Sequence, residues 1–206
     1  MCQLLETIRI ENGEPQLIGY HQERMNCAAQ ELWNGIAPNL QVTLMRMDFP
    51  AEGVFKCRIV YGREIEKVEV IPYTIRNIQS LKLIEGNNID YSHKWVDRTA
   101  INELYENRGI SDDILIVKDG LITDTSYCNV VLGNDIDGWF TPENPLLDGV
   151  MRQSLIDTGE IEERAIKVED LSRYKYIRLI NAMMPWQTGP EFLTETIETA
   201  VGYDYQ

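Results

Sequence analysis

Residues 77–94 read NIQSLKLIEGNNIDYSHK, and they separate two halves of the chain that have different patterns. The stretch has no strong helical period, and Gly86-Asn87-Asn88 is typical of a turn. We interpret residues 79–92 as a linker, because domain boundaries fall in turn-rich segments with few regular elements. The sequence therefore predicts a small domain over residues 1–78 and a larger domain over residues 93–206.

The half before this stretch predicts a small α/β domain. Residues 3–10 alternate loosely and carry β-branched side chains, and the turn signal ENGE at 11–14 indicates a hairpin with residues 15–19. Residues 20–33 repeat apolar side chains at three-to-four spacing, which is typical of an amphipathic helix, and Asn34-Gly35 ends it. The other elements predicted for this half are a helix over 40–47 and strands over 54–62 and 66–73.

The half after it predicts mixed β-strands with few helices. Residues 96–109 have an amphipathic helical pattern that ends at a glycine. Asp119-Gly120, inside the segment 114–124, is typical of a type I′ hairpin turn. The further elements predicted here are strands over 129–133, 138–142 and within 174–186, and a helix over 149–157. We therefore expect an α/β (α+β) protein with two domains.

Composition and charge argue against several kinds of partner. The 206 residues are 44% hydrophobic and 25% charged, which is ordinary for a globular chain. A formal net charge of -14 argues against nucleic acid, because phosphate binding needs clustered lysine and arginine, although a few local arginines can still bind a small anion. The four cysteines lack zinc-site spacing, so no metal is expected. The segment MCQLLETIRI has no signal-peptide pattern and no apolar run is long enough to span a bilayer, so we expect a cytoplasmic protein without a membrane partner.

Several single residues are candidates for chemistry, but each also has a structural interpretation. Lys94, in YSHKWVDR at 91–98, would ordinarily be a solvated surface charge. Arg24 would be a helix charge, and Asp124 and Asn181 would be turn residues that bond to local backbone. The start of the helix at 149–157 offers backbone amides that can bind an anion. The sequence has no glycine-rich dinucleotide or phosphate loop to compete with these candidates.

Taken in order, six motifs resemble one family. They are LLETIR at 4–9, His21-x-x-Arg24, Lys94-x-x-x-Arg98, Thr123-Asp124-x-x-x-x-Asn129, Gly149-Val150-Met151-Arg152 and Asn181-Ala182. Together they resemble the class IV aminotransferase-like, fold-type IV pyridoxal-phosphate enzymes. The stretches GVMRQSLIDTGEIEERAIKVEDL at 149–171 and IRLINAMMPW at 177–186 are most similar to the 4-amino-4-deoxychorismate lyases of that family.

This resemblance implies a fold, a cofactor and a set of roles. The fold would be like that of D-amino acid aminotransferase, with pyridoxal 5'-phosphate in a cleft between the two domains and with a homodimer as the assembly. Lys94 would form the Schiff base and act as general acid and base, because lysine is the side chain that can do both. The cofactor phosphate would meet Arg24, Asn181 and the backbone amides of Val150 and Met151. Asp124 would pair with the ring nitrogen, where the family usually has glutamate.

The resemblance also implies a small anionic substrate. Arg98, and with it Arg58 and Arg152, would bind the substrate carboxylates. Arg58 and Arg152 also fit a structural role, since each lies in a regular element where a charged residue is normal. The expected reaction converts 4-amino-4-deoxychorismate to 4-aminobenzoate and pyruvate, a step of folate biosynthesis.

Two other functions stay open at this point. A class IV aminotransferase of branched-chain or D-amino acids would use the same lysine, although Thr99 stands where branched-chain enzymes tend to have tyrosine. The aspartate in place of glutamate also leaves open a cofactor-binding or scaffold protein without catalysis. Against that alternative, each charge and donor that the cofactor needs is represented in the sequence.

Overall fold

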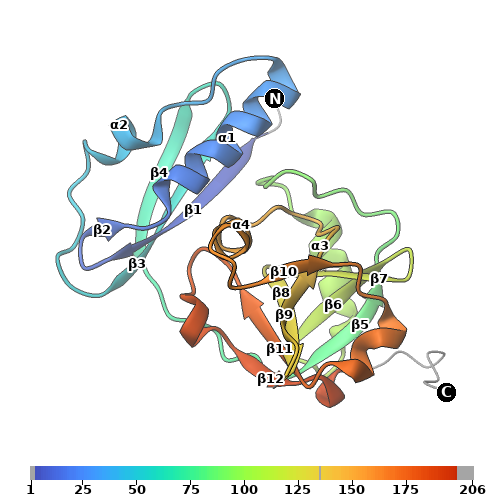
Figure 1. The fold of residues 1–206 in the computed structure, drawn as a ribbon. Helices are drawn as coiled ribbons and strands as arrows, with labels where there is room; N and C mark the ends of the chain where they lie inside the picture. Colours follow the sequence, from blue (N-terminus) through green and yellow to red (C-terminus); the bar gives the residue numbers. More distant parts are fainter. Residues whose placement is uncertain (1–2, 135, 199–206) are drawn as a thin grey trace. The chain divides into compact units, whose positions relative to one another are not determined.

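The computed structural model describes residues 3–134 and 136–198, so the outermost residues of both predicted domains, 1–2 and 199–206, lie outside the described residues. The chain divides into two compact units (Figure 1). The first unit, unit 1, contains residues up to Ile75, His93–Asp97 and Ala182–Pro185. The second, unit 2, contains Arg76–Ser92, Arg98–Asn181 and the described residues from Trp186 onward.

Unit 1 is an antiparallel sheet covered by a helix. Its elements are β1 (Leu4–Glu11), β2 (Glu14–Pro15), α1 (Ile18–Trp33), α2 (Leu40–Leu44), β3 (Val54–Tyr61) and β4 (Ile65–Pro72). The strand order is β2-β1-β3-β4, and α1 lies against one face of this sheet (Figure 1). The strand predicted over residues 15–19 is largely wrong, because β2 ends at Pro15 and residues 18 and 19 begin α1. The other strands and helices predicted before residue 74 are present, with ends within a few residues of the predicted bounds.

The core of unit 1 follows from the alternation of β1. Leu4, Ile8 and Ile10 point to one face, as expected for a period of two, and they pack with buried residues of α1 that include Met25 and Ala29. These side chains have exposed fractions of 0–1%. The same alternation places residue 6 on the buried face, where the sequence has a glutamate instead of an apolar side chain.

The segment around Lys94 is attached to the edge of this sheet. Leu4 and Trp95 form an antiparallel bridge, the Leu5 amide donates to the Lys94 carbonyl at 2.9 Å, and the Val96 amide donates to the Gln3 carbonyl at 3.0 Å. Trp95 also packs against the core of unit 1. Backbone pairing therefore fixes the position of the Lys94 backbone beside the first half of β1.

Unit 2 is built on a larger mixed sheet. Its strands are β5 (Leu81–Glu85), β6 (Asp113–Lys118), β7 (Leu121–Thr125), β8 (Asn129–Asn134), β9 (Gly138–Pro142), β10 (Glu162–Arg164), β11 (Tyr176–Ile180) and β12 (Glu191–Leu193). Its helices are α3 (Thr99–Tyr105) and α4 (Val150–Asp157), with short 3-10 turns at η1 (Glu106–Arg108), η2 (Val168–Arg173), η3 (Trp186–Thr188) and η4 (Thr194–Thr196). Within the described part of the chain these strands form one eight-stranded sheet, ordered β10-β9-β8-β7-β6-β5, with β11 paired to β8 and β12 to β11.

The segment 79–92, predicted as a linker, contains strand β5 instead. Leu81 and Leu83 have exposed fractions of 0% and 1%, and β5 pairs in parallel with β6, Leu81 opposite Asp113. A five-residue strand with a parallel partner some thirty residues further along the chain is hard to recognise, because a parallel pair leaves no hairpin signal between its strands. Residues 93–97 and 182–185 also belong to unit 1, although they fall inside the predicted domain 93–206.

Other elements of unit 2 agree with their predicted types. The helical pattern at 96–109 becomes α3 and η1 and ends at Gly109, whose φ is 65°. Asp119 and Gly120 have φ values of 52° and 79°, which a type I′ turn requires at both central positions. Among the described residues, no helix has both the length and the apolar character to cross a membrane. The whole is an α/β (α+β) architecture, as predicted.

Candidate active site

A fully buried carboxylate in unit 1 binds two cationic or polar side chains of α1. Arg24 donates to Glu6 through Nε at 3.0 Å and through Nη2 at 2.6 Å. His21 Nδ1 donates to Glu6 Oε2 at 2.5 Å. The side chains of Glu6 and His21 are 0% exposed and that of Arg24 is 15% exposed. The two contacts from Arg24 form a bidentate pair, which fixes the plane of its guanidinium group.

The pKa values in this group follow from burial and charge together. Burial raises the pKa of Glu6, but the Arg24 charge and the His21 hydrogen bond outweigh it and lower the pKa to about 2. Burial lowers the pKa of His21, Glu6 raises it, and the charges of Arg24 and Lys94 lower it further. His21 is therefore neutral at neutral pH, with its proton on Nδ1 facing Glu6.

Lys94 lies within electrostatic reach of this group. Its charge contributes to the low pKa of His21, and its side chain is half-buried. The flanking rings of His93 and Trp95 are in edge contact, with centroids 5.3 Å apart, and His93 Nε2 lies 3.4 Å from Glu31. Unit 1 thus brings together two of the predicted site residues, Lys94 and Arg24.

Unit 2 contains a second buried carboxylate, Asp124, at the end of β7. Asp124 Oδ1 accepts from Asn129 Nδ2 at 2.9 Å, and Oδ2 accepts from the Leu147 amide at 3.0 Å. Burial raises its pKa to about 7, against the lowering effects of these bonds and of the Arg152 charge. A carboxyl group with such a pKa can hold or release a proton near neutral pH.

Asn129 links Asp124 to the start of α4. Its Nδ2 also donates to the Leu147 carbonyl at 2.8 Å, and a Cβ added to Gly149 would lie 1.8 Å from Asn129 Oδ1. Gly149 is the N-cap of α4, and no side chain among residues 3–134 and 136–198 caps that terminus. Val150 is buried and Met151 half-buried in the first turn. Position 149 therefore has no room for a side chain, and the helix start keeps the amides that an anion would need.

Asn181, the remaining residue predicted to contact the phosphate, follows β11 directly. Its Nδ2 donates to Cys128 Sγ at 3.1 Å. Burial raises the pKa of Cys128, so this sulfur is a neutral thiol. The contact joins the end of β11 to the turn that precedes β8.

The three arginines predicted to bind substrate have different surroundings. Arg98 donates through Nη2 to the Ser126 carbonyl, and its buried Nε has no hydrogen-bond partner within the described ranges. Arg58, in β3, pairs with Glu69 of β4 at 3.2 Å. Arg152 is 2% exposed and donates to Glu163 at 2.5 Å and to the Pro142 carbonyl at 2.9 Å, with Asp148 at 3.3 Å. The contacts of Arg58 and Arg152 favour the structural role left open above.

Three residues of these groups were not assigned a role from the sequence. Glu6 and Asn129 stand inside the motifs, and the structure shows them as the partners that hold Arg24 and Asp124. A charged residue in an alternating apolar strand was the signal available for Glu6. Asp113, 0% exposed at the start of β6, had no such signal, because it follows another aspartate in a turn-like segment.

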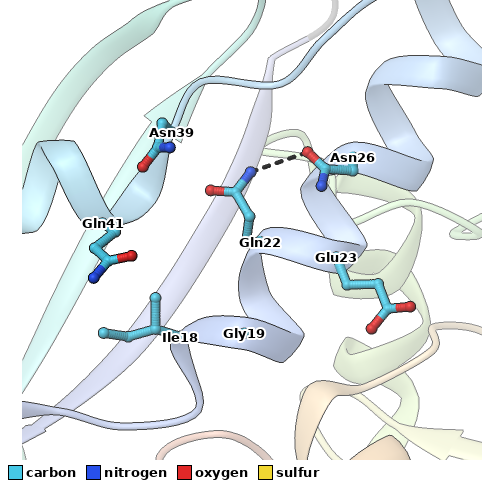
Figure 2. Close-up of a pocket in the computed structure, with 7 residues that line it drawn as sticks. All are labelled: Ile18, Gly19, Gln22, Glu23, Asn26, Asn39 and Gln41. Carbon is cyan, nitrogen blue, oxygen red and sulfur yellow. Dashed lines mark hydrogen bonds between the residues drawn. The ribbon is translucent and has the colours of Figure 1, made fainter.

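A separate pocket of about 600 Å³ lies on unit 1 (Figure 2). Its lining residues are Ile18, Gly19, Gln22, Glu23, Asn26, Asn39 and Gln41. Gln22 donates to Asn26 at 3.0 Å, as Figure 2 shows, and to the Pro38 carbonyl at 3.2 Å, and it accepts from the Leu40 amide at 2.7 Å. These amides connect α1 to the start of α2, and the lining contains none of the predicted site residues.

Comparisons with known proteins identify the family. The model of the amino-transferase class IV family matches residues 76–190. An uncharacterized protein of Haemophilus influenzae is 34% identical over 186 residues, which cover 89% of this chain and 98% of the relative. The chain therefore belongs to the class IV aminotransferase family of pyridoxal-phosphate enzymes.

Solved structures show the same fold. The crystal structure of a "putative 4-amino-4-deoxychorismate lyase" from Haemophilus somnus 129PT has a TM-score of 0.83 and 33% identity, covering 89% of this chain and 97% of that one. A hypothetical aminotransferase from Mycobacterium tuberculosis, in a form with pyridoxal phosphate bound, has a TM-score of 0.74 and 19% identity, covering 95% and 81%. The predicted fold-type IV architecture is confirmed.

The residues of this chain fit the family's cofactor. An uncapped helix start with no room for a side chain at Gly149 suits a phosphate group, and a buried carboxyl group suits a pyridine nitrogen, because an ionised carboxylate favours the protonated ring. Aspartate is one methylene shorter than the usual glutamate, and here both of its oxygens already accept hydrogen bonds. Each oxygen has a second lone pair, so an additional N–H donor can still be accepted.

Proposed function

We propose that this enzyme is a pyridoxal-phosphate-dependent lyase that converts 4-amino-4-deoxychorismate to 4-aminobenzoate and pyruvate. The observation that carries this choice over amino transfer is the 33% identity and TM-score of 0.83 shared with the Haemophilus somnus protein over nearly the whole of both chains. The aminotransferase structures from Mycobacterium tuberculosis and Curtobacterium pusillum share 19% and 18% identity with this chain and support the fold alone. We also propose that the enzyme works as a cytoplasmic homodimer.

In this proposal Lys94 carries the cofactor and moves the substrate proton. Its amine must lose its charge to act, and the positive charge of Arg24 disfavours a further positive charge nearby. Arg24, held in a fixed plane by Glu6, contributes a charged donor for the phosphate group. The Val150 and Met151 amides and Asn181 supply the other donors.

Asp124 sets the electronic state of the cofactor ring. When bound, pyridoxal phosphate supplies an electron sink for charge that develops on the substrate carbon bearing the amine. Asp124 would keep a proton on the ring nitrogen, because the negative charge of its ionised carboxylate favours the protonated form of a nitrogen beside it. Asn129 holds the carboxyl group in place at 2.9 Å.

The reaction needs one proton removed and one delivered. Lys94 removes the proton from C4 of the substrate ring, the C–O bond to the enolpyruvyl group breaks, and the ring becomes aromatic. A proton delivered to the methylene carbon of the departing group completes pyruvate, so that substrate atoms and electrons balance without water or an oxidant. Arg98 binds a carboxylate of the substrate throughout.

Absorbance of the purified, cofactor-loaded protein tests the role of Lys94. We expect a Schiff-base band that borohydride abolishes, with the added mass on the peptide containing Lys94. Lys94→Ala should show no such band, whereas Lys67→Ala, which removes an exposed lysine paired with Glu69, should keep it. A protein with no band and no labelled Lys94 would support the scaffold alternative and exclude both enzymatic ones.

Incubation with 4-amino-4-deoxychorismate then tests the reaction. Formation of pyruvate and 4-aminobenzoate in equal amounts, without an added 2-oxo acid, is the expected result. Amino transfer that depends on a 2-oxo acid, with no release of pyruvate from aminodeoxychorismate, would show the enzyme to be an aminotransferase. Sedimentation at micromolar concentration should give twice the mass of the chain if the homodimer forms.

A further inference from the structure

The turn between β7 and β8 receives the Arg98 side chain. Arg98, the N-cap of α3, donates through Nη2 to the Ser126 carbonyl, so its guanidinium group is attached to the backbone of this turn. Its Nε is buried and has no acceptor in the described part of the chain. The Arg98 residue as a whole is half-buried, so the turn holds the guanidinium group without enclosing all of it.

The same turn is held from its other side by Asp113. Ser126 Oγ donates to Asp113 Oδ2 at 3.0 Å, and the Ser126 amide lies 3.4 Å from Asp113 Oδ1. Asp113 is 0% exposed, and its Oδ1 also accepts from the Ile114 amide at 2.7 Å. The Thr125 amide closes the turn on the Cys128 carbonyl at 2.8 Å. Asp113 therefore fixes both the hydroxyl and the amide of Ser126. The peptide plane that contains the Ser126 carbonyl is fixed by the Tyr127 amide, which donates to Thr125 Oγ1 at 3.3 Å.

A buried carboxylate is a costly way to brace a turn. A neutral or apolar side chain of similar size would avoid the desolvation of the charge, and such replacements are commonly neutral or stabilising. Burial raises the pKa of Asp113, and Arg76, the charged group that acts against this effect, is exposed and stacks on the Tyr127 ring with its guanidinium carbon 4.9 Å from the centroid. Packing alone does not account for a carboxylate at position 113.

We propose that Asp113 is a positioning residue for substrate recognition: through Ser126 it orients Arg98, whose guanidinium group then binds a carboxylate of the substrate. This inference rests on the proposed function for the choice of ligand and adds a residue that does not itself touch substrate. The ligand group is a carboxylate. Aminodeoxychorismate carries two carboxylates, and after the reaction one is found in 4-aminobenzoate and the other in pyruvate.

The test measures binding of these two products separately by calorimetry on the cofactor-loaded protein. Asp113→Asn keeps the size of the side chain but removes its charge. It also replaces Oδ2, the oxygen that accepts from the Ser126 hydroxyl, by an amide nitrogen, which cannot accept. We expect about tenfold weaker binding of one product, the size of effect typical for a hydrogen bond to a charged group, with the cofactor absorbance unchanged. In the lyase assay KM should rise by a similar factor, with kcat nearly unchanged.

A double-mutant cycle separates positioning from general destabilisation. Arg98→Gln should weaken binding of the same product at least as much, and Asp113→Asn should have no further effect in the Arg98→Gln background. Asp112→Asn is the matched control: this neighbouring aspartate is exposed and accepts from the Gln79 and Ser80 amides, so its loss should leave both products bound as in the wild type.

Each other outcome overturns the inference. Independent, multiplicative effects of Asp113→Asn and Arg98→Gln, an equal effect of Asp112→Asn, or unchanged binding of both products would show Asp113 to be structural. If Asp113→Asn does not fold, Ser126→Ala replaces it in the double-mutant cycle with Arg98→Gln, since this change removes only the hydroxyl contact to Asp113. If no Schiff-base band forms, the proposed function has failed, and the cycle measured with the cofactor-free protein still decides whether Asp113 acts through Arg98.

Discussion

Replacement of Glu6 by glutamine tests whether the buried group of unit 1 stabilises the fold. The pKa of Glu6 falls from an ordinary 4.5 to about 2 in the folded protein. At 1.36 kcal/mol for each tenfold change in proton affinity, this difference corresponds to about 3 kcal/mol of stability at pH 7. Glu6→Gln should therefore lower the free energy of unfolding by about 3 kcal/mol, since it also leaves Arg24 without its counter-charge.

The dependence on pH gives the sharper form of this prediction. Because the folded-state pKa is depressed, the stabilisation is complete above about pH 4.5 and is lost as the pH falls toward 2. About 2 kcal/mol of it should be gone at pH 3. Urea unfolding from pH 7 to pH 3 should show this loss in the wild type and its absence in Glu6→Gln. The two curves should approach each other as the pH falls.

Two further measurements isolate the contribution of Glu6. Glu6 raises the pKa of His21, so the variant keeps His21 neutral to lower pH, and NMR of the His21 ring in both proteins gives the correction. Glu69→Gln is the control, because Glu69 is also paired with an arginine and has a lowered pKa but lies at the surface, where such pairs contribute little. Equal stability of wild type and Glu6→Gln at pH 7, or parallel pH curves, would refute the reasoning.

The other predictions concern unit 2. The pKa of Asp124 is raised in the folded protein, so its contribution to stability is fully present below about pH 4 and is lost as the pH rises through about 7. The cofactor-free wild type should therefore lose stability over this range more steeply than Asp124→Asn. Urea unfolding at several pH values measures the difference. Parallel curves for the two proteins would contradict that assignment. Gly149→Ala should destabilise the protein by about 1–3 kcal/mol and weaken retention of pyridoxal phosphate, since the new Cβ would lie 1.8 Å from Asn129 Oδ1. Gly19→Ala in α1, where nothing lies within 4 Å of the new Cβ, should instead stabilise by about 0.4–1 kcal/mol, and a similar loss in both variants by thermal unfolding would argue against a special role of position 149.

Local patterns in the sequence were sufficient for most elements of the fold. The helix that becomes α1, the strands β3, β4 and β9, and the Asp119-Gly120 turn were all predicted from periodicity or turn residues. Each of these depends on interactions within a few residues, such as alternation on one strand or the positive φ that a turn requires. The motifs in their order also indicated the family, which the family match and the relatives confirm.

Longer-range features were decided by the tertiary structure. Strand β5 was missed because α3 separates it in the sequence from its partner β6, so the pair leaves no local signal. The packing of residues 93–97 against β1 depends on the part of the β1 edge that the two-residue β2 leaves unpaired. The sequence names Arg24, Asp124 and Arg98 as candidates but says nothing of what orients them. Glu6 holds Arg24, Asn129 holds Asp124, and Asp113 holds Ser126, whose carbonyl accepts from Arg98. These contacts form only because elements far apart in the sequence bury the side chains together, and burial strengthens a polar contact.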